Sequence, residues 1–344
     1  MLVMGIETSC DETAVGLVED RLVVRANVIA SQLELHAPYG GVVPEVAARA
    51  HLELLQPTID RALVEAGARL SDVEGLAVTA GPGLVGALLV GVSAAKGLAL
   101  ARDLPLVGVN HLQAHVVAAQ LEFGDLEAPL VALVVSGGHT SIVELDTDGV
   151  FHELGATIDD AAGEAFDKIG RFLGLPFPGG PEIDRLARAG DPNAIAFPRA
   201  MSRDGTFDMS LSGLKTAVIR YLRRLEDAGE DPNLADVAAS FQEAIVDVQV
   251  EKTLGAAAVR GVERIVIAGG VAANSRLRER MAAACADAGI QLLSPSPVLC
   301  TDNGAMVAAA GANLLAAGVR SGLELSADPS LALGSLPAEP RVTG

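Results

Sequence analysis

The stretch that decides the fold is PLVALVVSGGHTSIVELD, residues 129–146. Its two apolar runs on either side of SGGHTS predict a pair of strands joined by a tight turn. A third strand is expected at residues 150–154, and predicted helices and strands alternate after it. Near the start of the chain, GIETSCDETAVGLV (residues 5–18) repeats this design with a turn rich in hydroxyls and carboxylates. The chain therefore contains one type of unit twice.

The first half follows the order βββαβαβα. Hydrophobic periodicity predicts its first three strands at residues 3–6, 14–18 and 23–29, and a helix over 44–66 in which Pro57 marks a kink or a restart. The remaining elements are expected as a strand at 76–79, a helix at 84–101, a strand at 106–109 and a helix at 111–122.

The second half repeats this order and carries one insertion, at about residues 174–228. After its three strands we expect helices at 159–173 and 235–259, a strand at 264–268, a helix at 275–288, a strand at 291–293 and a helix at 303–316. The predicted domains are residues 1–128 and 129–344. The last helix is assigned to the second domain, and the alternative is that it packs back on the first domain.

The topology resembles that of actin, the sugar kinases and the heat-shock chaperone ATPases, all of the RNase H-like class. This resemblance implies an α/β fold of two duplicated actin-like domains that face a central cleft. Ligands of open α/β sheets bind at the carboxyl ends of strands, so the paired hairpin turns are natural phosphate contacts. The fold alone does not specify a reaction.

Composition indicates an intracellular globular protein. Half of the 344 residues are hydrophobic, and the cysteines, Cys10, Cys285 and Cys300, form no CxxC pair, so we expect a reducing cytoplasm. The formal charge of −19 disfavours general affinity for nucleic acid. Residues 168–224 are different, because ten basic residues against five acidic ones leave a local charge of +5, which predicts either a nucleic-acid surface or a solvated helical face.

Two apolar motifs in the first half do not carry the function that they suggest. The run at residues 75–95 is long enough to span a bilayer, but Gly81-Pro82-Gly83 breaks it into a strand, a turn and a buried helix. Residues 81–86, GPGLVG, match the dinucleotide pattern GxGxxG but have no acidic partner after the following strand. No GxxxxGK[ST] motif occurs, so an ordinary P-loop NTPase is excluded.

Three loops are candidates for contacts to a ligand. SGGHTS (136–141) lets backbone N–H groups approach an anion, although it is also an ordinary hairpin turn. AGGVAANSRL (268–277) fits a strand-to-helix turn that packs on an adenine or ribose, with a simple capped turn as the alternative. ETSCDET (7–13) has carboxylates and no positive charge, so it suits a metal, an amine or a proton, and it makes Cys10 a poor thiolate.

His111 and His115 stand four residues apart in GVNHLQAHVVAA (108–119). Both can bind one ion from a single helix face, although such pairs also arise on ordinary helices. The pattern is not HExxH, because Leu112 follows His111. A third ligand must come from elsewhere, and Asp302 in CTDNGAMVAAAG, at a helix start in the second repeat, is our candidate. Two histidines and a carboxylate suit iron or zinc with positions left for substrate.

Taken together, the motifs resemble the tRNA N6-adenosine threonylcarbamoyltransferase family (bacterial TsaD), formerly called O-sialoglycoprotein endopeptidase. The resemblance covers nearly the whole chain and rests on GIETSCDET (5–13), GGVVPEVAARAH (40–51), AGPGLVGALLVG (80–91), HLQAH (111–115), VSGGHTS (135–141), DDAAGEAFDKIGR (159–171), PGGP (178–181), LSGLKT (211–216), AGGVAAN (268–274) and CTDNGAM (300–306).

The resemblance implies roles for individual residues. His111, His115 and Asp302 correspond to the ligands of one divalent metal ion, usually Fe²⁺ and in some cases Zn²⁺. The implied contacts to threonylcarbamoyl-adenylate are Val134, Val135, Ser136, Gly137, Gly138, Asp167, Gly180, Asn274 and, as a further contact, Asp184. Asn110 and Arg102 depart from the residues common at their positions, and neither is an implied ligand.

The implied reaction transfers the threonylcarbamoyl group from the adenylate to N6 of the adenosine 3′ to the anticodon in tRNAs that read ANN codons. Such a transfer needs alignment, a cation and an acceptor for the amine proton. Our hypothesis is that Asp11 or Glu12 orients or deprotonates the amine. The implied protein partners are TsaB-like and TsaE-like subunits, with tRNA as substrate and no membrane. The alternatives are an actin-like ATPase or kinase, a metalloprotease and a non-catalytic scaffold.

Overall fold

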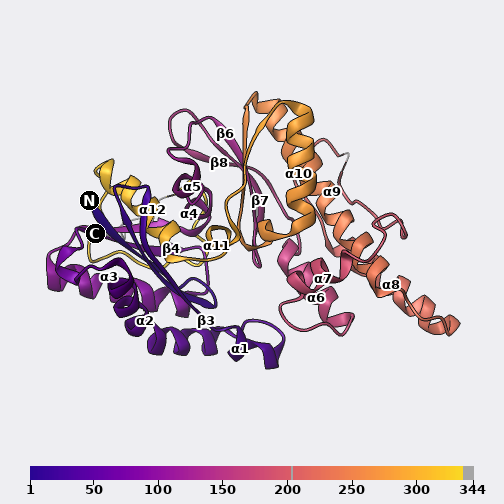
Figure 1. The fold of residues 1–344 in the computed structure, drawn as a ribbon, viewed down its shortest axis with the longest axis horizontal. Helices are drawn as coiled ribbons and strands as arrows, with labels where there is room; N and C mark the ends of the chain where they lie inside the picture. The colour runs from indigo at the N-terminus through magenta and orange to yellow at the C-terminus, as the bar shows by residue number, and fades with distance from the viewer. Residues whose placement is uncertain (203, 336–344) are drawn as a thin grey trace, which may run out of the picture. The chain divides into compact units, whose positions relative to one another are not determined.

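The computed structural model describes residues 1–202 and 204–335, which form two compact units. The first unit comprises Met1–Leu126 and the described residues from Val298 onward, and the second comprises Glu127–Pro297. Each unit is built on one five-stranded sheet (Figure 1).

The first sheet has the strand order β3-β2-β1-β4-β5. Its first three strands pair antiparallel, with Gly5 opposite Gly16, whereas β4 and β5 run parallel to β1. Every residue of β4 is buried, as expected for a parallel strand covered on both faces. The strands are β1 (Leu2–Glu7), β2 (Glu12–Glu19), β3 (Val23–Ser31), β4 (Gly75–Gly81) and β5 (Leu106–Asn110).

The second sheet has the order β10-β9-β6-β7-β8, which matches the first sheet strand for strand when it is read from β8. Again three strands are antiparallel and the last two are parallel. The predicted duplication and the α/β class are therefore confirmed. The strands are β6 (Leu130–Val135), β7 (Thr140–Leu145), β8 (Phe151–Ala156), β9 (Arg264–Ala268) and β10 (Gln291–Leu293).

The helix predicted at 44–66 spans Pro44–Ala66 and continues through Pro57, so it does not restart there. The helix predicted at 111–122 is two shorter helices. The elements are α1 (Leu33–His36), η1 (Ala37–Tyr39), α2 (Pro44–Ala66), η2 (Leu70–Asp72), α3 (Val85–Arg102), α4 (His111–Val117), α5 (Gln120–Phe123) and α12 (Gly304–Ala316); α11 (Pro297–Cys300) lies where the chain re-enters this unit.

The last helix, α12, packs directly on the first sheet, against β1, β2 and β4. Small residues allow this close approach. A Cβ added to Gly16 would lie 2.3 Å from the backbone N of Ala305, and one added to Gly304 would lie 2.0 Å from the N of Gly16. Asp302, just before this helix, therefore belongs to the same unit as the two histidines. The order of the repeat alone predicts that it belongs to the second unit.

The membrane-like run divides as predicted into β4, a turn and α3. In the described part of the chain, α3 is the one helix long and apolar enough to cross a membrane. Its residues Val92, Ala95 and Ala99 pack in the core of the first unit. The glycines of GPGLVG serve close packing, because a Cβ on Gly81 would lie 1.9 Å from the carbonyl oxygen of Asp328.

The second unit contains the predicted insertion. Residues 174–228 hold two helices between α6 and α9, and α9 packs against both α7 and α10. The helices are α6 (Ala162–Phe172), α7 (Gly179–Ala187), α8 (Ser212–Ala228), α9 (Leu234–Arg260), η3 (Gly270–Ala273) and α10 (Ser275–Ala288).

Candidate active site

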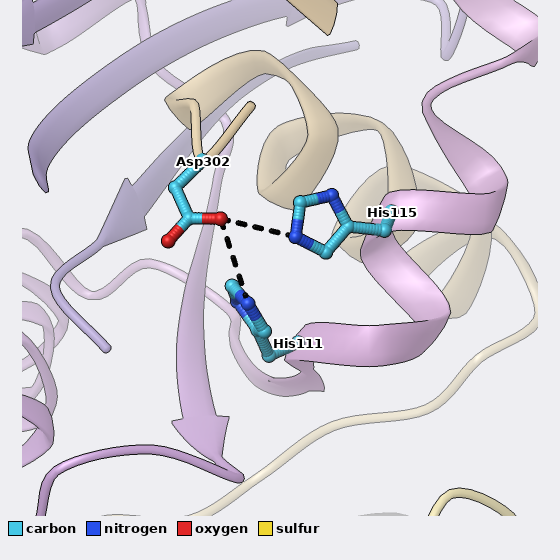
Figure 2. A group of neighbouring side chains, drawn as sticks. All are labelled: His111, His115 and Asp302. Carbon is cyan, nitrogen blue, oxygen red and sulfur yellow. Dashed lines mark hydrogen bonds and ion pairs between the residues drawn. The ribbon is translucent and has the colours of Figure 1, made fainter. Parts of the chain in front are cut away.

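His111, His115 and Asp302 lie together in the first unit (Figure 2). One potential ligand atom from each residue lies within 4.8 Å of the others. Asp302 Oδ1 is 3.0 Å from His115 Nε2 and 3.6 Å from His111 Nε2. Both histidines are buried, whereas the Asp302 side chain keeps 19% of its surface exposed. The structure thus brings the three predicted ligands into one cluster with access from outside.

Two asparagine caps fix the helices that carry these ligands. Asn110 Oδ1 accepts hydrogen bonds from the backbone N–H of Leu112 and Gln113 at the start of α4. Asn303 Oδ1 accepts the N–H of Met306 at the start of α12, directly after Asp302. Capping satisfies N–H groups that a helix leaves without intrahelical partners. Asn110, the asparagine that departs from the family pattern, therefore anchors the start of the histidine helix.

His111 has a hydrogen-bonded anchor on its other ring nitrogen. Nδ1 lies 3.1 Å from Glu7 Oε2 and 3.2 Å from Ser9 Oγ. Glu7 is completely buried at the end of β1, and its Oε2 also accepts the hydroxyl of Thr79 at 2.6 Å. Glu7 is the first residue of the ETSCDET loop (7–13), and the sequence predicts no individual role for it. Its place at the end of the strand that pairs with β4 was the available signal.

The cluster fits a metal ion by the chemistry of its donors. Two imidazole nitrogens and a carboxylate oxygen are the donor set of iron or zinc sites that keep open positions. Nδ1 of His115 is buried and has no hydrogen-bond partner among the described residues. Burial by itself lowers the pKa of His111, but the negative charges of Glu7 and Asp302 outweigh burial and raise this pKa to about 9. Such concentrated negative charge suits a cation.

The pKa values of the next two acidic residues, Asp11 and Glu12, are raised by burial. Burial raises the pKa of Glu12 to about 7, against a hydrogen bond from Ser31 Oγ to Oε1. The other oxygen, Oε2, is buried without a partner among the described residues. Burial and the charge of Asp302 raise the pKa of Asp11. Burial and Asp11 also raise the pKa of the Cys10 thiol, in agreement with a poor thiolate.

In the second unit, the turn after β6 lies against the start of α6. The backbone N–H of Gly163 donates to the carbonyl of Ser136 at 3.2 Å. A Cβ on Gly163 would lie 2.7 Å from Gly137 Cα, so only glycine permits this approach. Gly137 and Gly138 themselves are exposed, and a Cβ on either would meet nothing within 4 Å. Val134 and Val135 are buried at the end of β6.

The other predicted contacts are linked to one another through α6, α7 and α10. Asp167 of α6 accepts the backbone N–H of Gly179 at the start of α7, beside Gly180. Asp184 of α7 accepts the hydroxyl of Ser275 at 2.7 Å. The preceding Asn274 caps α10 through Leu277 N. η3, between Gly269 and Asn274, contacts both β6 and α6, so these loops are neighbours within one unit.

The basic insertion carries a group of exposed arginines on α8. Several of its cations form ion pairs, as with Arg199 and Asp247, and Arg203 lies outside the described residues. On α8, Arg220, Arg223 and Arg224 are exposed and recur at helical spacing. The described interactions give them no ion pair; Arg224 lies over the ring of Tyr221, 5.3 Å from its centroid.

Solved structures resemble this chain in fold. HypF from T. kodakarensis matches with a TM-score of 0.61 and 16% identity over 92% of this chain, which spans about half of HypF (48%). (R)-2-hydroxyglutaryl-CoA dehydratase component A of Acidaminococcus fermentans matches with a TM-score of 0.55 and 14% identity, over 92% of this chain and 99% of that one. These likenesses place both units in the actin-like ATPase fold class.

Sequence comparison identifies the family. The family model for tRNA N6-adenosine threonylcarbamoyltransferase matches residues 23–309. A protein of that name from Geobacter sp. is 52% identical over 336 residues, 98% of each chain. Another from Symbiobacterium thermophilum is 55% identical over 333 residues, 97% of each chain. The chain therefore belongs to the tRNA N6-adenosine threonylcarbamoyltransferase family.

Proposed function

We propose that this protein transfers the threonylcarbamoyl group of threonylcarbamoyl-adenylate to N6 of the adenosine 3′ to the anticodon in tRNAs that read ANN codons. The observation that carries the proposal is the match, over nearly full length and at half identity, to transferases of this name. It favours a transferase over the ATPase, kinase and metalloprotease that the sequence left open.

The transfer is an acyl substitution. The N6 amine forms a C–N bond to the carbamoyl carbon, the C–O bond to the phosphate breaks, AMP leaves, and the amine gives up a proton. We assign donor binding to the second unit, through Val134, Val135, Ser136, Gly137, Gly138, Asp167, Gly180, Asp184 and Asn274. Exposed glycines of the β6–β7 turn support this assignment, because backbone N–H groups without Cβ obstruction suit a phosphate.

The metal site is assigned to His111, His115 and Asp302, with one Fe²⁺ per subunit and Zn²⁺ as the alternative ion. A divalent cation bound there supplies positive charge against negative charge that develops on the donor. The three residues hold the ion, and Asp302 is the ligand on the accessible side. The ligand atoms within 4.8 Å of one another support this site.

Asp11 and Glu12 are the proposed acceptors or orienters of the amine proton. Glu12 is the stronger candidate for the acceptor, because burial raises its pKa to about 7 and leaves Oε2 without a partner among the described residues. A general base works best with a pKa near the working pH. Alanine at both positions should abolish transfer while donor binding persists; intact transfer would remove this assignment.

Partners are inferred from surfaces. The arginine face of α8 supports tRNA binding, because unpaired cations gain most from phosphate contacts. Val85, Leu89 and Leu100 are exposed at helical spacing on α3, which supports docking of a TsaB-like subunit. A TsaE-like subunit and a cytoplasmic location follow from the resemblance alone.

The direct test incubates the purified, iron-loaded protein with threonylcarbamoyl-adenylate and an unmodified tRNA transcript. Digested nucleosides are then analysed by mass spectrometry. We expect threonylcarbamoyladenosine only when donor, tRNA and protein are all present. TsaB-like and TsaE-like subunits are added in a second series, because they belong to the proposed assembly. Absence of the product in both series would contradict the function.

A further inference from the structure

The buried carboxylate of Glu7 is the most constrained acidic group beside the metal cluster. We propose that Glu7 is a positioning residue: it holds the Nδ1 proton of His111 and thereby presents Nε2 of that ring to the metal ion. The inference rests on the proposed metal site and adds to it a residue outside the three ligands.

The carboxylate is fixed at both oxygens. Oε1 accepts the backbone N–H of Ser9 at 2.5 Å, and Oε2 accepts the hydroxyl of Thr79 at 2.6 Å. Glu7 is entirely buried, so no water competes for these positions. The group therefore cannot rotate away from His111 without breaking hydrogen bonds and leaving buried polar groups unsatisfied, which is unfavourable.

The remaining contact decides the state of the imidazole. Nδ1 of His111 lies 3.1 Å from Glu7 Oε2, and an ionised carboxylate only accepts hydrogen bonds, so Nδ1 carries the proton. In the deprotonated form that binds a metal ion, the one remaining N–H is on Nδ1, which leaves the lone pair on Nε2. Nε2 is the atom that lies 3.6 Å from Asp302 Oδ1. The hydrogen bond thus selects the tautomer whose free nitrogen points into the cluster.

His115 provides the contrast. Its Nε2 lies 3.0 Å from Asp302 Oδ1, whereas its Nδ1 has no partner among the described residues. Among the described residues, His111 therefore has a hydrogen-bond partner on Nδ1, whereas His115 has none. Partners that orient a ligating histidine commonly account for about 10–100-fold in metal affinity. We assign that contribution to Glu7 acting on His111.

The test measures zinc binding by the full-length protein in competition with a chromophoric chelator. Glu7→Gln keeps the shape but replaces one acceptor oxygen by a donor, and we expect zinc affinity to fall about 10–100-fold. Glu7→Asp keeps the charge and draws the carboxylate back from the ring, so it should also weaken binding. Thr58→Val is the control. It removes a buried hydroxyl of α2 whose one described hydrogen bond goes to the Leu54 carbonyl, and this variant should bind zinc like the wild type.

A second readout separates positioning from general damage. Spectra that correlate ring protons with nitrogens in protein labelled with ¹⁵N-histidine report the tautomer of each of the six histidines. In the zinc-loaded wild type, His111 should carry its proton on Nδ1; Glu7→Gln should disturb this signal and leave that of His152 unchanged. If Glu7→Gln does not fold, Glu7→Asp carries both measurements.

The outcomes are distinct. Wild-type zinc affinity together with an unchanged His111 tautomer in the folded variant overturns the role of Glu7. Equal zinc binding by the wild type and by His111→Ala overturns the metal site, and the role of Glu7 falls with it. Weakened zinc binding as predicted supports the inference even if no threonylcarbamoyladenosine forms, in which case only the proposed function fails.

Discussion

The two sheets share one strand order, yet the turn after the first strand differs completely between the units. In the first unit this turn follows the buried Glu7 and contains the half-buried Asp11, whose pKa is raised by burial and by the charge of Asp302. In the second unit it contains Gly137 and Gly138, which are exposed, and a Cβ added to either would meet nothing within 4 Å. The fold therefore supplies the same position twice. Under the proposed function, the first turn serves a cation and a proton and the second turn serves an anion.

The largest effect is expected when a candidate metal ligand of the first unit is removed. His115→Ala should lower transfer by at least about 100-fold and reduce bound metal, because the cluster loses one of three donors. Metal analysis and product formation are measured on the same sample. His152→Ala, which removes an exposed histidine of the second unit, is the matched control and should match the wild type. Equal losses in both variants would contradict the assignment.

The glycine turn provides the next test. Gly138→Ala should leave thermal stability unchanged, because the new Cβ meets open space, but should weaken donor binding by about tenfold if the backbone approaches a phosphate. Gly163→Ala is the structural counterpart. Its Cβ would lie 2.7 Å from Gly137 Cα, so it should lower the melting temperature. Calorimetry and adenylate titration distinguish the two. Unchanged donor affinity in Gly138→Ala would remove the phosphate role.

Reversing the charge of Arg220, Arg223 and Arg224 should weaken tRNA binding by about 5–10-fold near physiological salt. Each lost phosphate contact should also reduce the magnitude of the slope of log K against log[salt] by about 1. Adenylate binding should not change, since none of the three is an assigned donor contact. Titrations at several salt concentrations provide the measurement, and equal tRNA affinity before and after would refute the surface.

The smallest effect concerns pH. Burial raises the pKa of Glu12 to about 7, so the carboxylate that accepts a proton forms only as the pH rises through this value. Transfer should therefore increase severalfold between about pH 6 and pH 8, and Glu12→Gln should flatten this limb. Rates at saturating donor test it. If the transfer rate of Glu12→Gln still rises between about pH 6 and pH 8, another group accepts the proton.

Much of the architecture could be predicted because its elements have clear periodicity. The strands Arg264–Ala268 and Gln291–Leu293 and the helix Ser275–Ala288 occur at the predicted residues. The repeat left two placements open for the last helix and so for Asp302, and the docking of α12 on the first sheet depends on tertiary packing of small residues. The break after Val117 likewise depends on local packing that periodicity does not record.

The candidate metal ligands could be predicted from spacing and resemblance, whereas the residue that supports His111 could not. HLQAH identified His111 and His115, but the buried hydrogen bond from His111 Nδ1 to Glu7 depends on β1, β4 and β5 lying side by side. A single sequence gives the strands without the contacts between their ends. The same limit applies to Ser275, whose hydroxyl reaches Asp184 from another helix.

The most direct test of the central claim strips the protein of metal with a chelator and measures threonylcarbamoyladenosine formation as Fe²⁺ is returned. The wild type should be inactive without metal and recover with about one equivalent of ion, while Asp302→Ala should stay inactive at the same concentration. Full transfer by the stripped wild type, or equal recovery by Asp302→Ala, would contradict a metal centre built from the two histidines and this aspartate.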